Sequence, residues 1–266
     1  MSKIFICIYN PNSFDAVLEY AKEHSYNLEI SIFGIPRFYD DWQEILKDCQ
    51  QKLHEFEGAI SVHGAFADLV IHSEDKKVRE AARQMVFQSL DIVRELKAER
   101  IVFHGNFDPS QRRERYERNW IERNAVFWSE VLEKYPSTVV LENTHDLTPE
   151  MLRMLLDEVS SSRLKICLDI GHVNFWSKAP VEEWIAVLGK DIRSIHIHDN
   201  KGDDDSHLAP GKGTINWPEF SDLIAKYQID PDIVFEVETL ETTIQSLKYF
   251  REENIYPCNT FAGHSI

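Results

Sequence analysis

The chain has 266 residues, 43% of them hydrophobic, and carries a formal net charge of −16 at pH 7. This acidic balance argues against non-specific binding to nucleic acid, whose affinity comes mainly from the neutralisation of phosphates. No run approaches the ~20 apolar residues of a membrane span, so we expect neither a membrane anchor nor a signal peptide. The four cysteines show no CxxC spacing, which favours reduced thiols and a cytoplasmic protein.

Short runs rich in Ile and Val recur at even intervals along the chain and predict buried parallel strands. They cover residues 3–9, 27–33, 59–64, 100–105, 138–143, 164–170, 192–198 and 232–238. Each is followed by a segment with helical character, at 12–24, 40–56, 74–98, 114–134, 149–159, 181–188, 217–227 and 240–253. Strands that alternate with helices predict a parallel sheet, and eight such units close as a barrel. We therefore predict an α/β fold, a single (β/α)₈ TIM barrel domain spanning residues 1–266.

Polar residues stand at the C-terminal ends of the predicted strands from the third to the eighth. The steps from Glu142 to Asp169 and from Asp169 to His196 are 27 residues each, about one strand–helix unit. Barrel enzymes assemble their sites from residues at this one end, so we expect these side chains to converge. The set comprises His63, His104, Glu142, Asp169 with His172, His196 with His198, and Glu236 with Glu238.

Such a collection of ionisable groups predicts a metal site. Taken alone, a His at a strand end is more often a hydrogen-bonded core residue, and a single Glu could be structural. Burying this many together without a cation would cost several kcal/mol per unpaired charge. Imidazole and carboxylate ligands suit Zn²⁺, Mn²⁺ or Co²⁺, with Mg²⁺ as a further candidate. We expect at least one bound divalent ion and leave two or three open.

The stretch around the seventh strand sharpens this prediction. His196 and His198 alternate with Ile195 and Ile197, which directs both imidazoles to one face of the strand. An acidic loop then crosses the rim of the barrel. The glycines that flank Lys212 in this loop are a weak signal for a phosphate site, and an ordinary loop is the favoured interpretation.

Several segments resemble the xylose isomerase-like TIM barrel superfamily: VLENT, CLDIGH, HIHDN, DSHLAPGKGTINW and FEVE. The resemblance runs from the second predicted strand to the eighth. The superfamily holds sugar isomerases and epimerases, inosose dehydratases and type IV apurinic endonucleases. In its sugar-converting members one divalent metal is held by four residues, matched here by Glu142, Asp169, His196 and Glu236. The resemblance further implies that His172 contacts the substrate.

The chain also resembles the endonuclease branch, in which three zinc ions use additional ligands. His63, His104, Asp205 and His207 occupy matching positions. His172 lies in CLDIGH, which is common to both branches, and with these four residues it could complete two further metal sites. Two departures favour the sugar branch. The endonucleases read roughly HAPY after the third strand, where this chain reads HGAF from His63, and their HLNDSK is HIHDNKG here.

We therefore predict a divalent-metal-dependent isomerase or epimerase that acts on a sugar, sugar phosphate or polyol through an ene-diolate. Glu142 and Glu236 would serve as base and acid. The predicted substrate-binding residues are His172, His198, His207 and Trp176, the last stacking on a sugar ring. A small carbohydrate is the expected partner, and a homo-oligomer is left open. The alternatives are a metal-dependent phosphodiesterase acting on abasic DNA, a sugar dehydratase, and a metal-binding barrel without catalysis.

Overall fold

A computed structural model describes residues 2–111 and 113–258 of the chain. Within these residues eight parallel strands close into a barrel in chain order, with β8 pairing back onto β1. The predicted (β/α)₈ fold is thereby confirmed. The strands are β1 (Ile4–Ile8), β2 (Asn27–Ile30), β3 (Ile60–His63), β4 (Arg100–His104), β5 (Thr138–Glu142), β6 (Leu164–Asp169), β7 (Ile192–Ile197) and β8 (Asp232–Phe235).

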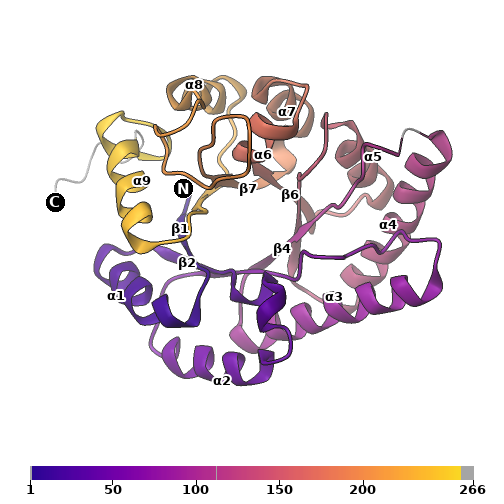
Figure 1. Ribbon diagram of the computed structural model, residues 1–266, viewed down its shortest axis with the longest axis horizontal. Coiled ribbons are helices and arrows are strands. Elements are labelled where there is room, and N and C mark those ends of the chain that lie inside the picture. The colour runs from indigo at the N-terminus through magenta and orange to yellow at the C-terminus, as the bar shows by residue number, and fades with distance from the viewer. Residues whose placement is uncertain (1, 112, 259–266) are drawn as a thin grey trace.

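Helices form a ring outside the strands (Figure 1). They are α1 (Phe14–His24), α2 (Trp42–Lys52), α3 (Lys76–Leu96), α4 (Glu114–Lys134), α5 (Glu150–Val159), α6 (Ile170–Trp176), α7 (Val181–Leu188), α8 (Trp217–Tyr227) and α9 (Leu240–Glu252). Every predicted helix is present: α4, α7 and α8 have the predicted bounds, and the others have ends shifted by up to four residues. The helix α6 was not predicted. This short helix begins directly after β6, where the Asp169 carboxylate accepts a hydrogen bond from the backbone N–H of His172. Side-chain caps of this kind satisfy backbone donors that a helix start leaves unpaired.

Strand residues alternate between two environments. Ile101 and Phe103 on β4 belong to the large apolar cluster that includes the helices, whereas Val102 between them contacts Val140 and Cys167 inside the barrel. This alternation is the period-two pattern of a strand buried on both faces. Among the residues that the structure describes, no helix is both long and apolar enough to cross a membrane.

Strand register explains why polar residues gather at one end. His104 pairs with Glu142 across β4 and β5, and Asp169 pairs with His196 across β6 and β7. Partners in register lie side by side, so these residues reach the barrel mouth at the same height. Glu236 follows the last residue of β8 and joins them there.

The opposite end of the barrel is closed by an ion network. Arg100, the first residue of β4, is 1% exposed and donates hydrogen bonds to Asp232 at 2.7 Å and to Glu99 at 2.8 Å. Its guanidinium lies 4.1 Å from the centre of the Phe5 ring. Arg193 adds a second contact to Asp232 at 2.9 Å. At this end, two cationic side chains neutralise the buried carboxylate of Asp232.

Candidate metal centre

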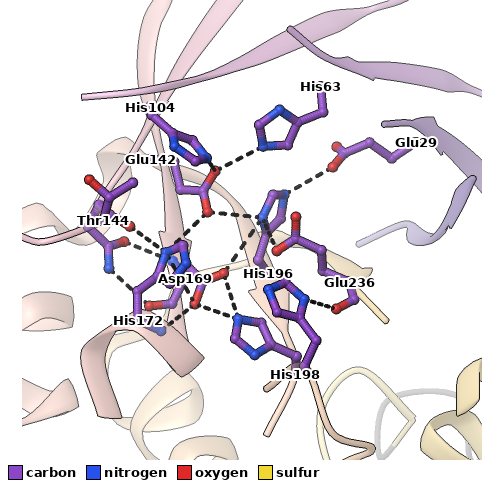
Figure 2. A network of polar contacts seen from close by, with 12 residues as sticks. Glu29, His63, His104, Glu142, Thr144, Asp169, His172, His196, His198 and Glu236 are labelled. Carbon is purple, nitrogen blue, oxygen red and sulfur yellow. Dashed lines mark hydrogen bonds and ion pairs between the residues drawn. The ribbon is translucent and has the colours of Figure 1, made fainter. Parts of the chain in front are cut away.

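Four side chains from consecutive strands meet in the barrel mouth and form what we call the central group: Glu142, Asp169, His196 and Glu236. Each offers one ligand atom, and these atoms all lie within 4.8 Å of one another. His196 Nδ1 lies 2.9 Å from Glu236 Oε2, 3.4 Å from Glu142 Oε1 and 3.8 Å from Asp169 Oδ2. Figure 2 shows these four side chains close together, and all four residues are buried.

The ligand atoms of the central group suit a divalent cation better than they suit hydrogen bonds to one another. Glu142 Oε1, His196 Nδ1 and Glu236 Oε2 are buried and form no hydrogen bond of acceptable geometry with the described residues. None of the described residues that line the adjoining cavity is Lys or Arg. Three carboxylates aimed at one imidazole without a cation would carry a large desolvation penalty. A divalent ion with oxygen and nitrogen ligands removes that penalty.

A second group lies beside the first and consists of His172, His198, Asp205 and His207. Asp205 Oδ2 is 3.2 Å from His172 Nε2 and 3.5 Å from His207 Nε2. His198 Nε2 is 3.7 Å from Asp205 Oδ1 and 3.1 Å from both oxygens of Asp169. Asp169 therefore lies between the two groups.

The third group consists of His63, His104 and Glu142. Glu142 Oε2 is 3.2 Å from His63 Nε2 and 3.4 Å from His104 Nε2. Burial lowers the pKa of His104 to about 3, so that imidazole is neutral and its lone pair is available to an ion. The structure thus brings every predicted ligand into one connected cluster, in which Glu142 is shared.

Backbone carbonyls fix the orientation of three of the imidazoles. His63 Nδ1 lies 3.0 Å from Gly64 O, His172 Nδ1 lies 2.8 Å from Asn143 O, and His207 Nδ1 lies 2.8 Å from Glu236 O. A carbonyl only accepts, so Nδ1 is the protonated nitrogen in each ring. Nε2 then faces the carboxylates, which is the arrangement of a metal-ligating histidine.

Ion pairs hold this cluster together in the metal-free protein. Burial opposes the ionisation of Asp169, but His172 and His198 outweigh it and lower the pKa of Asp169 to about 2. Burial likewise opposes the protonation of His207, but Asp205 outweighs it and raises the pKa of His207 to about 9. Protons therefore occupy positions that a metal would take, and binding an ion must release them.

A cavity of about 260 Å³ opens onto the cluster. His172 and His207 line it, as their predicted substrate contacts require. The described lining residues are Tyr9, Ser31, Ile35, His63, Phe66, His104, Glu142, His172, Asp205, His207, Glu236 and Glu238. A larger hollow of about 520 Å³ around His72 and Tyr116 shares none of these residues, so the predicted ligands adjoin the smaller cavity.

Two predicted substrate residues lie elsewhere. His198 is fully buried, and its ring stacks on that of His207 with centroids 3.9 Å apart. The lack of a side chain at Gly171 makes room for this ring, since a Cβ there would lie 2.0 Å from it. Trp176 is 38% exposed at the end of α6. Its ring packs against that of His145, with centroids 4.6 Å apart, instead of lining the cavity. These positions place His198 with the ligands and give no support to a role for Trp176 at a sugar ring.

The loop after β7 owes its shape to Asp199, which the sequence did not single out. Its carboxylate accepts hydrogen bonds from the backbone N–H groups of Asn200, Gly211 and Ile215 and from the indole of Trp217. Gly211 has a φ of +83°, a backbone conformation that favours glycine. The glycines around Lys212 therefore serve the loop, as the favoured interpretation expects, and the loop carries Asp205 and His207 to the mouth.

Glu29 is a further residue that the sequence analysis missed. It lies on β2, is fully buried, and approaches His196 from the side away from the central group. A charged residue inside a strand that is buried on both faces is itself a signal. Tyr9 was also missed: it lines the cavity with a buried hydroxyl that has no hydrogen-bond partner among the described residues.

Comparisons with known proteins agree with this geometry. Residues 18–253 match the sequence profile of a family described as "Xylose isomerase-like TIM barrel". The chain is 27% identical over 256 residues to "Uncharacterized protein MJ1311" of Methanocaldococcus jannaschii, covering 92% of this chain and 86% of that protein.

Solved structures share the whole barrel. A "D-tagatose 3-epimerase-like protein" is 25% identical, with a TM-score of 0.79 over 98% of this chain and 100% of that one. The TTHB071 protein from Thermus thermophilus, solved after soaking with ZnCl₂, is 23% identical with a TM-score of 0.76, over 94% of this chain and 97% of that one. The second likeness shows the fold alone.

Proposed function

The chain belongs to the xylose isomerase-like TIM barrel family, and on that premise we propose that it is a divalent-metal-dependent isomerase or epimerase of a small carbohydrate. The observation that carries this proposal is the central group, in which Glu142 and Glu236 flank His196 with an oxygen each that has no hydrogen-bond partner among the described residues. The substrate class is a sugar, sugar phosphate or polyol. The likeness to a D-tagatose 3-epimerase-like protein supports the same class.

Glu142, Asp169, His196 and Glu236 would hold the ion. A bound divalent cation polarises a substrate carbonyl and lowers the barrier to losing the proton on the neighbouring carbon. Burial opposes the ionisation of Glu142, but His196 outweighs it and holds the pKa of Glu142 well below its usual range. Glu142 is therefore a carboxylate at neutral pH and able to accept a proton.

The reaction that suits two such carboxylates is proton transfer through an ene-diolate. One glutamate takes the proton from the carbon beside the carbonyl, and the other returns a proton to that carbon or to its neighbour. Return to the opposite face of the same carbon gives an epimer, and return to the neighbouring carbon gives an isomer. His172 and His207, which line the cavity, would orient substrate hydroxyls. At about 260 Å³ the cavity is small for a ligand site, which favours a single small molecule.

Solvent exchange tests this proposal. Incubating the enzyme with candidate ketoses in D₂O should place deuterium on the carbon beside the carbonyl. Glu236→Gln should abolish the exchange because an amide does not accept the proton. Metal content is measured on the same samples, since the substitution also removes a ligand oxygen. Glu241→Gln on the surface of α9 is the control and should exchange like the wild type.

One observation favours a rival function. The second and third groups complete the ligand set that the endonuclease resemblance implies for three ions. Elemental analysis gives the stoichiometry, and incision of an abasic-site duplex tests the activity. About three ions per chain with metal-dependent incision, and no deuterium exchange with any sugar, would overturn the isomerase proposal. The net charge of −16 weighs against that outcome, because proteins that bind a duplex usually present a basic surface.

A further inference from the structure

His196 is oriented differently from the other imidazoles of the mouth. His63, His172 and His207 each direct Nδ1 to a backbone carbonyl and Nε2 to carboxylates. In His196 the nitrogens exchange roles: Nδ1 faces the three carboxylates of the central group, and Nε2 lies 3.0 Å from Glu29 Oε1. In the metal-free protein this Nε2–Oε1 contact is an ion pair whose angle falls outside that of a hydrogen bond. Figure 2 shows Glu29 on the opposite side of the ring from Asp169.

From this geometry we propose that Glu29 is a positioning residue of the metal centre, whose carboxylate accepts the Nε2 proton of His196 and so presents Nδ1 to the ion. The inference rests on the metal site of the proposed function and adds a residue behind it. A neutral imidazole carries one proton. If that proton is held at Nε2, the lone pair at Nδ1 is directed to the point where the carboxylates meet.

Glu29 is itself held in place by the neighbouring strand. Its second oxygen accepts a hydrogen bond from Ser61 Oγ at 2.7 Å, and the two residues pair in register across β2 and β3. Ser61 and Glu29 are both fully buried. One carboxylate oxygen is thus fixed by Ser61 and the other is left for His196, so the acceptor cannot turn away from the ring.

Two other roles for Glu29 fit less well. It does not belong to any of the candidate ligand groups, because the His196 ring stands between it and the central group. As a purely structural group it would be a fourth carboxylate beside a single imidazole, since its ion pair among the described residues is with His196, whose Nδ1 already faces three others. A carboxylate buried at that cost gains most when it accepts from a metal-ligating imidazole, which it also makes a stronger ligand.

Metal affinity tests the inference without any assay of activity. Co²⁺ is titrated into the metal-free wild type, Glu29→Gln and Ser61→Ala, and the dissociation constant and the visible spectrum of bound Co²⁺ are recorded. Glu29→Gln should raise the dissociation constant about 10–100-fold, as loss of such a partner does elsewhere, and shift the spectrum. Ser61→Ala should raise it by a smaller factor. Asp146→Asn, which changes another buried carboxylate outside the groups, is the matched control and should leave it unchanged.

The outcomes separate this inference from the function beneath it. A wild type that binds no Co²⁺ removes the metal site and the proposed function. A wild type that binds Co²⁺, beside a folded Glu29→Gln of equal affinity and identical spectrum, overturns the role of Glu29 alone. If circular dichroism shows that Glu29→Gln does not fold, Ser61→Ala provides the test. A Co²⁺ affinity of Ser61→Ala equal to that of the wild type would then overturn the inference.

Discussion

At the N-terminal end of the barrel, Asp232 meets the guanidinium groups of Arg100 and Arg193. At the C-terminal end, the carboxylates of Glu142 and Glu236 meet only imidazoles among the residues that the structure describes. Both ends bury acidic groups, but only the first supplies fixed cations for them. The difference supports the proposed metal site at the C-terminal end, because barrel enzymes place their active sites at that end and residues that serve stability at the other.

Glu142→Gln should have the largest effect on the C-terminal end of the barrel, because this residue is shared by the central and third groups. We expect loss of metal from the central group and a fall of at least ~10³-fold in the proposed isomerisation, about 4 kcal/mol of transition-state stabilisation. The metal-free variant should be less stable than the wild type, since Glu142 pairs with His63 and His196 there. Equal metal content in variant and wild type would contradict the assignment.

Arg100→Met should lower the stability of the protein and leave its affinity for metal unchanged. Removing the guanidinium leaves Asp232 and Glu99 with reduced compensation, and breaking a buried ion pair costs about 3–5 kcal/mol of unfolding free energy. Urea denaturation measures this loss, while the affinity of the folded variant for Co²⁺ should stay unchanged. Arg94→Met on the exposed face of α3 is the control, with an expected change below about 0.5 kcal/mol. A weakened metal site in Arg100→Met would mean that the two ends are coupled.

The sequence was enough to predict the mouth but not the network at the other end. Strand ends are visible in the pattern, and a parallel barrel has all its strand ends on one side, so the convergence of His63, Asp169 and His196 could be predicted. The partners of Arg100 come from distant strands, and which charges meet there depends on register. Register is a property of the closed barrel that no single segment encodes.

Contacts that only the closed barrel defines also explain which residue roles the sequence analysis missed within the site. Glu29 lies on the far side of His196 from the carboxylates of the central group, and only the closed barrel shows that its carboxylate reaches Nε2 of His196. His198 was expected at the substrate, but its ring passes Gly171 and stacks on His207, a contact between three separate segments. Strand alternation predicts the face on which a side chain lies and does not predict its depth.

Adding metal should stabilise the folded protein through the C-terminal end of the barrel, by a smaller amount. An ion at 100 times its dissociation constant stabilises the folded state by about 2.7 kcal/mol. We expect this increment in the wild type and in Arg100→Met alike, and its loss in Glu142→Gln. Thermal melting with EDTA and with added Mn²⁺ or Zn²⁺ measures it. An increment that survives in Glu142→Gln would place the stabilising ion outside the central group.

The smallest effect concerns an imidazole near the mouth that has no carboxylate partner among the described residues. Burial and, to a smaller degree, Arg123 lower the pKa of His72 to about 4, whereas Asp205 raises the pKa of His207 to about 9 against the effect of burial. Because the folded-state pKa of His72 lies below its unfolded value of about 6.5, the unfolded chain binds the proton more tightly. The contribution of His72 to stability is therefore complete above about pH 6.5 and is lost as the pH falls towards about 4.

Between about pH 7 and pH 5 we expect His72 to account for about 1–2 kcal/mol of lost unfolding free energy. His72→Phe keeps a ring against Tyr116 and Trp120 but does not titrate, so its loss over the same interval should be smaller by that amount. Urea denaturation of both proteins in EDTA at the two pH values measures the difference, and equal losses would show that His72 is protonated in the folded protein.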